Sequence, residues 1–221
     1  MGNQINLVTS LHLKTKRNYI ERMINKKVKC MSVAKKYSND YWDGNRMYGY
    51  GGYKYIPGRW ASVAKKLISR YKLNNKSKIL DAGCGKGYLL YEIKKLLPSA
   101  KISGFDFSSY ALKKSHKEIK SFLFKHHIQK KYPYKKNEFD LVISLGVIHN
   151  LELPEVFYAL KEIQRVAKKC FVMTESYNND QELFNLQCWA LTCKTFLSVS
   201  DWKWLFKTCG FKGDFEFIFF K

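Results

Sequence analysis

The sequence predicts an α/β fold, a doubly wound and mostly parallel sheet between two layers of helices. The first observation is an apolar strand pattern at 77–81 that leads into a glycine-rich turn at 83–87. The second is the helical spacing of apolar residues directly after that turn, at 88–97. The third is that strand and helix patterns keep alternating toward the end of the chain, as parallel strands joined by crossover helices require.

Each further element follows from a local pattern of the same kind. Short runs rich in apolar and aromatic residues predict strands at Ser77–Asp81, Lys101–Asp106, Phe122–Phe124, Phe139–Ser144, Cys170–Glu175 and Phe215–Phe220. Apolar residues at helical spacing predict helices at Tyr19–Asn25, Trp60–Lys72, Tyr110 to about Lys120, Glu155–Lys169, Gln181–Phe196 and from Ser198 or Ser200 to Gly210.

The glycine turn has the pattern Asp-x-Gly-x-Gly-x-Gly, formed by Asp81, Gly83, Gly85 and Gly87. Glycines at alternate positions let a ligand approach bare backbone. A P-loop would need a Lys-Ser or Lys-Thr pair after the last glycine, but Lys86 precedes that glycine. An acid just before the turn repels a pyrophosphate and favours a cationic ligand group. A structural turn without any ligand is the plainer alternative.

This pattern resembles the first motif of class I S-adenosylmethionine (SAM)-dependent methyltransferases, and the resemblance covers about 60–221. The stretch 132–144, which ends in Phe-Asp-Leu-Val-Ile-Ser, is similar to a segment of the small-molecule enzymes related to ubiquinone and menaquinone biosynthesis. The resemblance implies a Rossmann-like fold that binds SAM and releases S-adenosylhomocysteine. It implies a cofactor site made by Asp81, Gly83, Cys84, Gly85, Gly87, Asp106, Phe107 and Leu145.

Asp106 follows the glycines by about 20 residues at the end of a strand, which suits the hydroxyls of a ribose. Two departures from the family pattern stand out. The family often has an Asp near the end of the third strand that contacts the adenine, but His126, His127 and Gln129 occupy that register here. The antiparallel hairpin that usually ends the family's sheet is reduced to one predicted strand.

Residues 1–60 are predicted to form a basic helix and an aromatic, glycine-rich lid over a SAM-binding domain at 61–221. The stretch 37–60 has neither helical nor strand periodicity, so an ordered loop is expected. Its aromatic rings either wall an acceptor pocket, where a π-face suits a sulfonium, or pack on the sheet edge. The predicted pocket residues are Tyr41, Trp42, Tyr50, Tyr53 and Trp189. Arg46 and Arg59 can hold a carboxylate of the cofactor or the acceptor, and Arg59 is counted with the cofactor site.

The formal net charge of +22 gives information about possible binding partners rather than about the fold. Only six of the 40 basic residues are Arg, the residue that favours bidentate recognition of phosphates and bases. A compositional bias toward Lys is therefore the plainer explanation, and nucleic acid is an open but not a favoured partner. No apolar run reaches membrane-spanning length and no signal-peptide pattern is present, which predicts a cytoplasmic protein. The six cysteines lack zinc-ligand spacing, so no metal site is predicted.

Methyl transfer needs an aligned nucleophile and, for a hydroxyl or amine, a base. His149, after the fourth strand, and Glu175, at the end of the fifth, are the candidate catalytic residues, although a histidine there is also a common structural hydrogen-bonding residue. The predicted function is SAM-dependent transfer of a methyl group to an O or N atom of a polar or anionic small molecule. The alternatives are an RNA or tRNA methyltransferase that uses the basic N-terminal region, and a SAM-binding, non-catalytic partner subunit. The sequence does not indicate an oligomeric state.

Overall fold

The computed structural model describes residues 2–12 and 17–221, so residues 1 and 13–16 of the predicted N-terminal segment lie outside the described residues. Six parallel strands form one sheet within the described chain. The strands are β1 (Lys78–Ala82), β2 (Lys101–Asp106), β3 (Leu123–Lys125), β4 (Phe139–Leu145), β5 (Ala167–Glu175) and β6 (Asp214–Ile218).

The strand order is β3-β2-β1-β4-β5-β6, so the chain winds outward in both directions from the β1/β4 pair. Ile79 pairs with Leu141 and Asp81 with Ile143 at this switch point. The glycine turn after β1 therefore opens at the crevice where such sheets bind ligands. The predicted doubly wound α/β fold is confirmed, and the sheet contains no antiparallel pair among the described residues.

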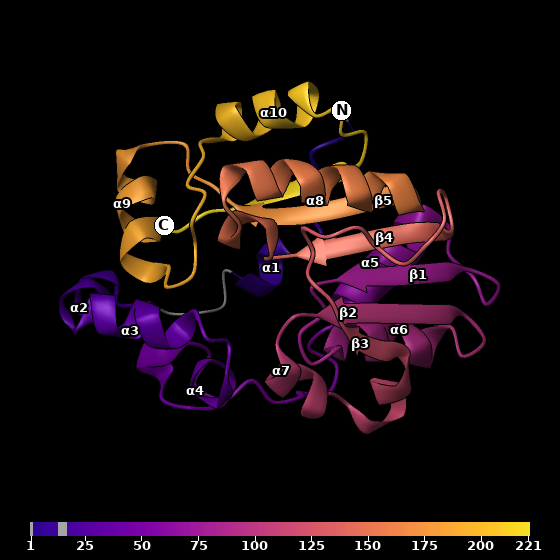
Figure 1. The fold of residues 1–221 in the computed structure, drawn as a ribbon, viewed down its shortest axis with the longest axis horizontal. Coiled ribbons are helices and arrows are strands. Elements are labelled where there is room, and N and C mark those ends of the chain that lie inside the picture. The colour runs from indigo at the N-terminus through magenta and orange to yellow at the C-terminus, as the bar shows by residue number, and fades with distance from the viewer. Residues whose placement is uncertain (1, 13–16) are drawn as a thin grey trace.

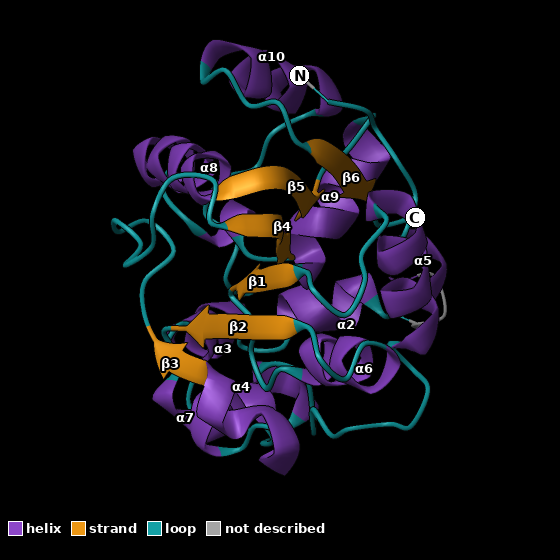
Figure 2. Cartoon of the chain, turned by 90° about the vertical axis from the view of Figure 1, so that its right-hand side faces the viewer, coloured by secondary structure: helices purple, strands orange, loops and turns teal. Residues whose placement is uncertain are grey.

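Helices cover both faces of the sheet. One layer contains α5 (Ala61–Tyr71) and α6 (Tyr88–Leu96), and the other contains α8 (Leu153–Val166) and α10 (Val199–Thr208). Figure 2 shows α5 and α6 on one side of the strands and α8 on the other. Leu67 and Ile93 are fully buried in the first layer, and Ile163, Trp202 and Phe206 in the second. Since both faces are covered, the central strands are apolar throughout rather than alternating.

The remaining helices are short. Near the N-terminus lie α1 (Thr9–His12), α2 (Tyr19–Ile24), α3 (Lys27–Ala34), α4 (Asn39–Trp42) and the 3₁₀ turn η1 (Arg46–Tyr48). The others are α7 (Ser109–Lys113), η2 (Lys117–Phe122), η3 (Ile148–Asn150) and α9 (Asp180–Trp189). Figure 1 shows α2, α3 and α9 gathered beyond the end toward which the β4 arrow points. The carboxyl ends of the strands are thus covered by segments from both halves of the chain.

The predicted helix from Tyr110 to about Lys120 was wrong in its length. The α-helix ends at Lys113, and a 3₁₀ turn follows from Lys117. His116 lies between them in extended conformation, and its ring stacks on Tyr91 with ring centroids 3.6 Å apart. Helical spacing of apolar residues did not reveal this aromatic contact.

Two more predicted helices end earlier than expected. The helix predicted at Glu155–Lys169 ends at Val166, and residues 167–169 already belong to β5. The helix predicted at Gln181–Phe196 ends at Trp189. After it, the backbone N–H groups of Lys194 and Thr195 donate to the His149 carbonyl at 2.9 and 3.0 Å. This tertiary pairing holds the segment after Trp189 away from helical conformation.

The N-terminal segment pairs with the last strand. Gln4 forms an isolated parallel bridge to Phe215, on the outer edge of β6. Glu216 is fully buried, and its carboxylate accepts backbone N–H groups of Leu7, Val8 and Thr9 at 2.6–3.0 Å. A carboxylate at the first turn of a helix also interacts favourably with the positive end of the helix dipole. This one side chain therefore fixes the path of the N-terminal segment along the sheet edge.

Leu7 and Val8 are buried in the same apolar cluster as α5 and α6. The described part of the N-terminal segment is consequently attached to the sheet at residues 4–9. The division into 1–60 and 61–221 stays a prediction. Within the described chain, no helix combines the length and the apolar character that crossing a membrane requires.

We expect Glu216→Gln to lower the free energy of unfolding by about 2–4 kcal/mol, because several charge-assisted hydrogen bonds in a buried site are lost. The carboxamide also places its NH₂ group against backbone donors. Urea denaturation measures the change, and limited proteolysis should show earlier cleavage before residue 19. Glu118→Gln, an exposed glutamate, is the control, and equal stability of the two variants would contradict this role for Glu216.

Candidate active site

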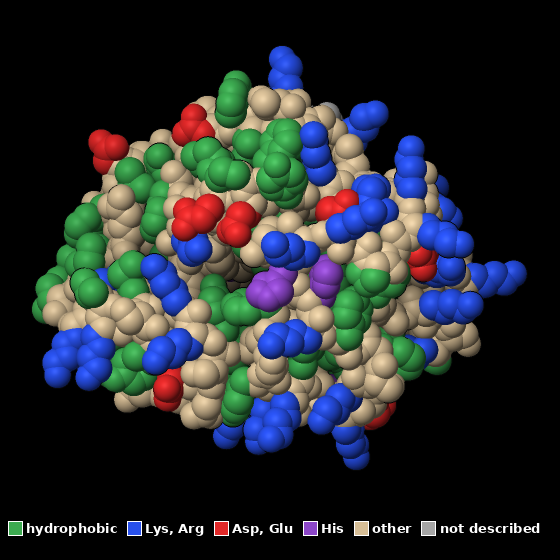
Figure 3. Space-filling model, viewed as in Figure 1, with side chains coloured by type: hydrophobic (Ala, Val, Ile, Leu, Met, Phe, Trp, Pro, Cys, Tyr) green, Lys and Arg blue, Asp and Glu red, His purple; other side chains and the backbone are tan. Residues whose placement is uncertain are grey.

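Two adjoining cavities lie at the carboxyl ends of the strands. The Asp106 cavity, about 380 Å³, is lined by Asp106, Phe107, His126 and residues of the lid. The Trp189 cavity, about 500 Å³, is lined by Trp189, His149, Glu175 and several arginines. Both volumes are in the usual range for small-molecule sites. Figure 3 shows a hollow near the centre of one face, with histidine side chains beside it.

The two cavities share part of their walls. The shared residues are Tyr41, Tyr50, Leu145, Gly146, Asn150 and Thr192. Leu145 ends β4, and Asn150 lies in η3 just after it. A molecule that fills one cavity can therefore reach a second molecule in the other. A shallower hollow of about 630 Å³ lies at the amino ends of β1 and β4, away from the glycine turn.

The glycine turn forms the floor of the Asp106 cavity. Gly83 lines it, and Gly85 has a φ of +55°, which favours glycine. A Cβ atom at Gly85 would lie 2.8 Å from Cη2 of Trp42, a lid residue whose ring is buried against the turn. The Trp42 indole donates to Ser108 Oγ at 3.0 Å. A side chain at Gly85 would therefore displace the lid.

Asp106 joins the glycine turn to the loop after β2. Its carboxylate accepts the backbone N–H of Gly85 at 2.9 Å and that of Ser108 at 2.8 Å. A carboxylate has about four lone-pair positions, so acceptor capacity for hydroxyl groups remains. Phe107, the next residue, is 38% exposed, and its ring stacks on His127 at 5.6 Å. Four of the predicted cofactor residues line this cavity, namely Gly83, Asp106, Phe107 and Leu145.

Asp81 is 4% exposed and lines neither cavity. Burial, and then the negative charge of Asp106, raises the pKa of Asp81 to about 8. Burial also raises the pKa of Asp106. A cation bound beside the turn would relieve this repulsion between two buried acids. Cys84 and Gly87, both within the turn, line neither cavity: Cys84 Sγ faces Gly104, and Gly87 is the N-cap of α6.

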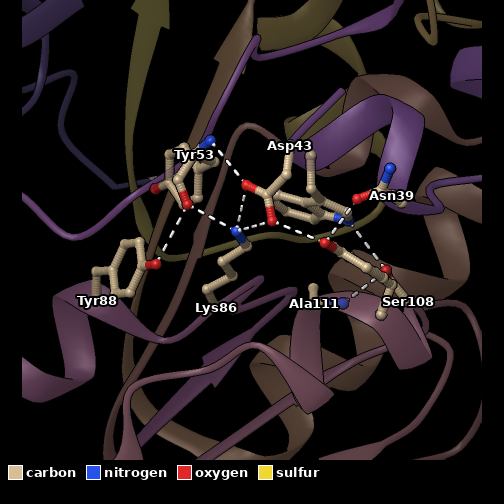
Figure 4. A network of polar contacts seen from close by, with 9 residues as sticks. Asn39, Asp43, Tyr53, Lys86, Tyr88, Ser108 and Ala111 are labelled. Atoms are coloured by element: carbon tan, nitrogen blue, oxygen red, sulfur yellow. Dashed lines mark hydrogen bonds and ion pairs between the residues drawn. The ribbon is translucent and has the colours of Figure 1, made fainter. Parts of the chain in front are cut away.

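A buried ion pair fastens the lid to the glycine turn. Lys86, within the turn, is 3% exposed, and its Nζ lies 2.7 Å from both carboxylate oxygens of Asp43 and from the Tyr53 carbonyl. The Tyr110 hydroxyl donates to the same carboxylate at 2.9 Å. Figure 4 shows Lys86 reaching across to Asp43 and Tyr53. Burial would raise the pKa of Asp43, but the hydrogen bonds from Lys86 and Tyr110 hold it below its ordinary value.

His149 and Glu175 meet in the Trp189 cavity. His149 Nε2 lies 3.4 Å from Glu175 Oε2, and the Glu175 backbone N–H faces His149 Nδ1 at 3.3 Å. Nδ1 therefore accepts, and Nε2 carries the hydrogen that points to the Glu175 carboxylate. Burial lowers the pKa of His149, so the ring is neutral. The two predicted catalytic residues are adjacent, and the hydrogen-bond directions leave Glu175 as the basic member.

The five predicted aromatic pocket residues lie around the two adjoining cavities, but they do not all line the same cavity. Tyr41 and Tyr50 line both cavities, Trp42 the Asp106 cavity, and Tyr53 and Trp189 the Trp189 cavity. Trp42 and Tyr50 stack with ring centroids 5.3 Å apart. Arg59 lines the Trp189 cavity near the start of α5. The rings thus pack on each other and also wall the two cavities, and their role in an acceptor pocket stays a prediction.

Comparison with known proteins identifies the family. The sequence profile described as a methyltransferase domain matches residues 73–210. The chain belongs to this methyltransferase family. It is 26% identical over 172 residues to a malonyl-[acyl-carrier protein] O-methyltransferase of Hahella chejuensis, an alignment that covers 73% of this chain and 60% of that protein. It is 30% identical over 114 residues to the demethylmenaquinone methyltransferase of Chlorobaculum parvum, covering 51% of this chain and 46% of that one.

The chain spans between 24% and 60% of the length of the curated relatives it matches. Among solved structures, a Bacillus halodurans protein described as a methyltransferase superposes with a TM-score of 0.55 at 20% identity, covering 66% of this chain and 68% of that one. A Galdieria sulphuraria protein described as a sarcosine dimethylglycine methyltransferase gives a TM-score of 0.54 at 16% identity, covering 69% and 59%. These likenesses confirm the predicted class I methyltransferase fold.

Several residues of this candidate site were not predicted from the sequence. Lys86 served only to exclude a P-loop, and its partner Asp43 was not singled out. Arg17 and Arg22 line the Trp189 cavity with Arg46 and Arg59, so four of the six arginines of the chain meet there. Arginine is rare in this sequence, and that rarity was the available signal.

We expect SAM affinity to rise between about pH 6 and pH 8, by at most about tenfold per pH unit, if Asp81 takes the SAM ammonium. Below pH 8 the empty protein keeps a proton on Asp81 that the complex must release, so higher pH favours binding. Calorimetric titration across this range measures the slope. Asp81→Asn should flatten it and Asp140→Asn, a carboxylate at the opposite edge, should not. An unchanged slope in Asp81→Asn would place Asp81 outside the binding step.

We expect Lys86→Met to lower the free energy of unfolding by about 3 kcal/mol and to weaken SAM binding, because Asp43 loses its buried partner and the lid its attachment. Lys168→Met is the matched control, since Lys168 pairs with Asp140 in an exposed position. That change should cost less than about 1 kcal/mol. Chemical denaturation and SAM titration of both variants test this. Equal losses for the two variants would show that the buried pair is not what holds the lid.

Proposed function

We propose that this protein transfers a methyl group from SAM to an O or N atom of an anionic small molecule. The observation that carries the proposal is the junction of two cavities of unlike charge at Leu145, Gly146 and Asn150. The Asp106 cavity has two acidic and two lysine side chains, whereas the Trp189 cavity has five cationic side chains and one carboxylate. A cationic cofactor fits the first and an anionic acceptor fits the second.

The residues of the Asp106 cavity fit SAM. Asp106 would accept the ribose hydroxyls, and Phe107 and His126 would contact the adenine. Among the described residues, His126 Nε2 and Asn150 Oδ1 are buried atoms without a hydrogen-bond partner, and both residues line this cavity. A bound nucleoside can supply such partners. Two residues outside the lining of this cavity would complete the site, Asp81 beside the glycine turn for the ammonium and Arg59 of the Trp189 cavity for the carboxylate. When bound, SAM supplies an electrophilic methyl group.

Glu175 would act as the base. Its carboxylate accepts a hydrogen from neutral His149, which orients it, and it can take a proton from a hydroxyl or amine as the nucleophile attacks. His149 would then be a positioning residue rather than the base. A lid of stacked rings around Tyr50 limits the access of water to the junction. The relative named demethylmenaquinone methyltransferase supports a small acceptor, and the relative named malonyl-[acyl-carrier protein] O-methyltransferase supports transfer to an oxygen atom.

We expect the wild-type protein to bind SAM and S-adenosylhomocysteine with dissociation constants of the order of micromolar. Calorimetric titration with each compound is the direct test. Absence of binding to both would contradict the proposal for the free protein. Binding of SAM together with RNA affinity that falls steeply with salt would instead favour an RNA acceptor.

Once an acceptor is found by screening anionic metabolites with radiolabelled SAM, we expect Glu175→Gln to lower kcat by about a hundredfold or more, with SAM affinity unchanged. His149→Gln should lower kcat less and shift the pH profile, because it disturbs the orientation of Glu175. An equal loss of SAM affinity and turnover in Glu175→Gln would assign Glu175 a structural role. Retained SAM binding without turnover on any acceptor would favour a non-catalytic partner subunit.

A further inference from the structure

Three guanidinium groups surround one indole ring in the Trp189 cavity. The Cζ atoms of Arg22, Arg46 and Arg17 lie 4.7, 5.1 and 5.4 Å from the centre of the Trp189 ring. Arg17 also lies 5.1 Å from the ring of Phe220. These residues come from four separate parts of the chain, before α2, within α2, in η1 and at the end of α9. Their convergence is a tertiary arrangement that no local propensity requires.

Two members of this cluster, Arg22 and Arg46, hold positive charges close to each other. Within the described chain, no carboxylate forms an ion pair with Arg22 or Arg46. Burial and the neighbouring charge of Arg46 lower the pKa of Arg22 to about 10. Burial and the charge of Arg17 lower the pKa of His12, which lines the same cavity, to about 4. Like charges held this close cost free energy unless an anion joins them.

A purely structural role explains only part of the arrangement. Arg22 donates to the carbonyls of Arg46 and Trp189, at 2.6 and 3.4 Å, and Arg46 donates from one nitrogen to Gly49 and Tyr50. These bonds fasten α2 and η1 to the end of α9. Each guanidinium has five N–H donors, so Arg22 and Arg46 keep donors beyond these bonds, and both side chains line the cavity.

The cluster lies in the part of the Trp189 cavity that is not shared with the Asp106 cavity. None of Arg17, Arg22, Arg46 and Trp189 lines the Asp106 cavity. Arg59, in contrast, precedes α5 and lies near Tyr53, whose carbonyl is bonded to Lys86 of the glycine turn. The arginines of this cavity thus fall into two separate groups, Arg59 near Tyr53 and the other three around Trp189.

We propose that Arg17, Arg22 and Arg46, with Trp189 as an apolar floor, bind a carboxylate or phosphate group of the acceptor that is not itself methylated. This inference rests on the proposed function and names its substrate class, an acceptor that carries an oxyanion and a separate hydroxyl or amine. An oxyanion held by several guanidiniums is a poor nucleophile, and Glu175 would repel it. The methyl group is therefore transferred to the hydroxyl or amine that lies beside Glu175. The bound oxyanion orients the acceptor for this transfer.

The test uses malonate and inorganic phosphate as probes of the cluster, titrated calorimetrically into the full-length protein saturated with S-adenosylhomocysteine. The wild type should bind at least one probe with a millimolar or lower dissociation constant, and the preferred probe distinguishes a carboxylate from a phosphate. The Arg22→Gln/Arg46→Gln double variant should lose at least tenfold in probe affinity. Arg70→Gln, a guanidinium paired with Asp214 on the surface, is the matched control and should bind the probe as the wild type does.

The cofactor is the second readout. Affinity for S-adenosylhomocysteine should change less than twofold in the double variant and should fall in Arg59→Gln. A fall in the double variant as large as in Arg59→Gln would show that the cluster holds the cofactor's carboxylate, and would overturn the proposal. Wild-type protein that binds neither probe, or a double variant that binds them normally, would overturn it as well.

If the double variant does not fold, the milder variant Arg22→Lys provides the test. It keeps the positive charge but removes the planar guanidinium that binds an oxyanion through two hydrogen bonds. It should weaken probe binding about threefold or more with a native circular dichroism spectrum, and unchanged binding would overturn the proposal. If the wild type fails to bind S-adenosylhomocysteine, the proposed function fails separately. Malonate and phosphate are then titrated into the protein without S-adenosylhomocysteine. The comparison of the wild type with the same variants still tests whether the arginine cluster binds an anion.

Discussion

The buried ion pair between Lys86 and Asp43 is the contact on which the site depends. Lys86 belongs to the glycine turn and Asp43 to the lid, so the pair joins the floor of the Asp106 cavity to its cover. Two strong oxygen contacts and a backbone carbonyl satisfy the ammonium group in a position that excludes water. The lid places Trp42 on Gly85 and Tyr50 over both cavities. The ion pair, together with the Trp42–Ser108 hydrogen bond, therefore holds this wall of the cavities in place.

Most of the sheet could be predicted because each strand is a short apolar run with its own boundaries. The pattern at Asp81–Gly87 predicted the turn that opens at the switch point, and Asp106 was placed beside it by its spacing. The ends of α7 and α9 could not be predicted, since His116 leaves the helix to stack on Tyr91 and the His149 carbonyl holds the segment after Trp189. Those constraints come from partners distant in sequence or on another element.

The site shows the same division between local and distant information. His149 and Glu175 each end a strand or follow one, and a parallel sheet brings such positions to one edge. The arginines around Trp189 have no common register, because they come from the lid, from α2 and from the segment before it. Their meeting depends on how α2 packs on α9, which no periodicity in either helix indicates. Composition gave one clue, the scarcity of Arg among the 40 basic residues.

The attachment of the N-terminal segment to β6 affects the order in which the site forms. All residues that line the Asp106 cavity lie between positions 35 and 194. The lining of the Trp189 cavity also includes Val8 and Phe220, which lie near the two ends of the chain. Closing so long a loop is entropically slow, and here Glu216 supplies the hydrogen bonds that complete it. A chain emerging from the ribosome can build its cofactor side before its acceptor side. Under the proposed function, the cavity assigned to the acceptor is therefore completed after the cavity assigned to the cofactor.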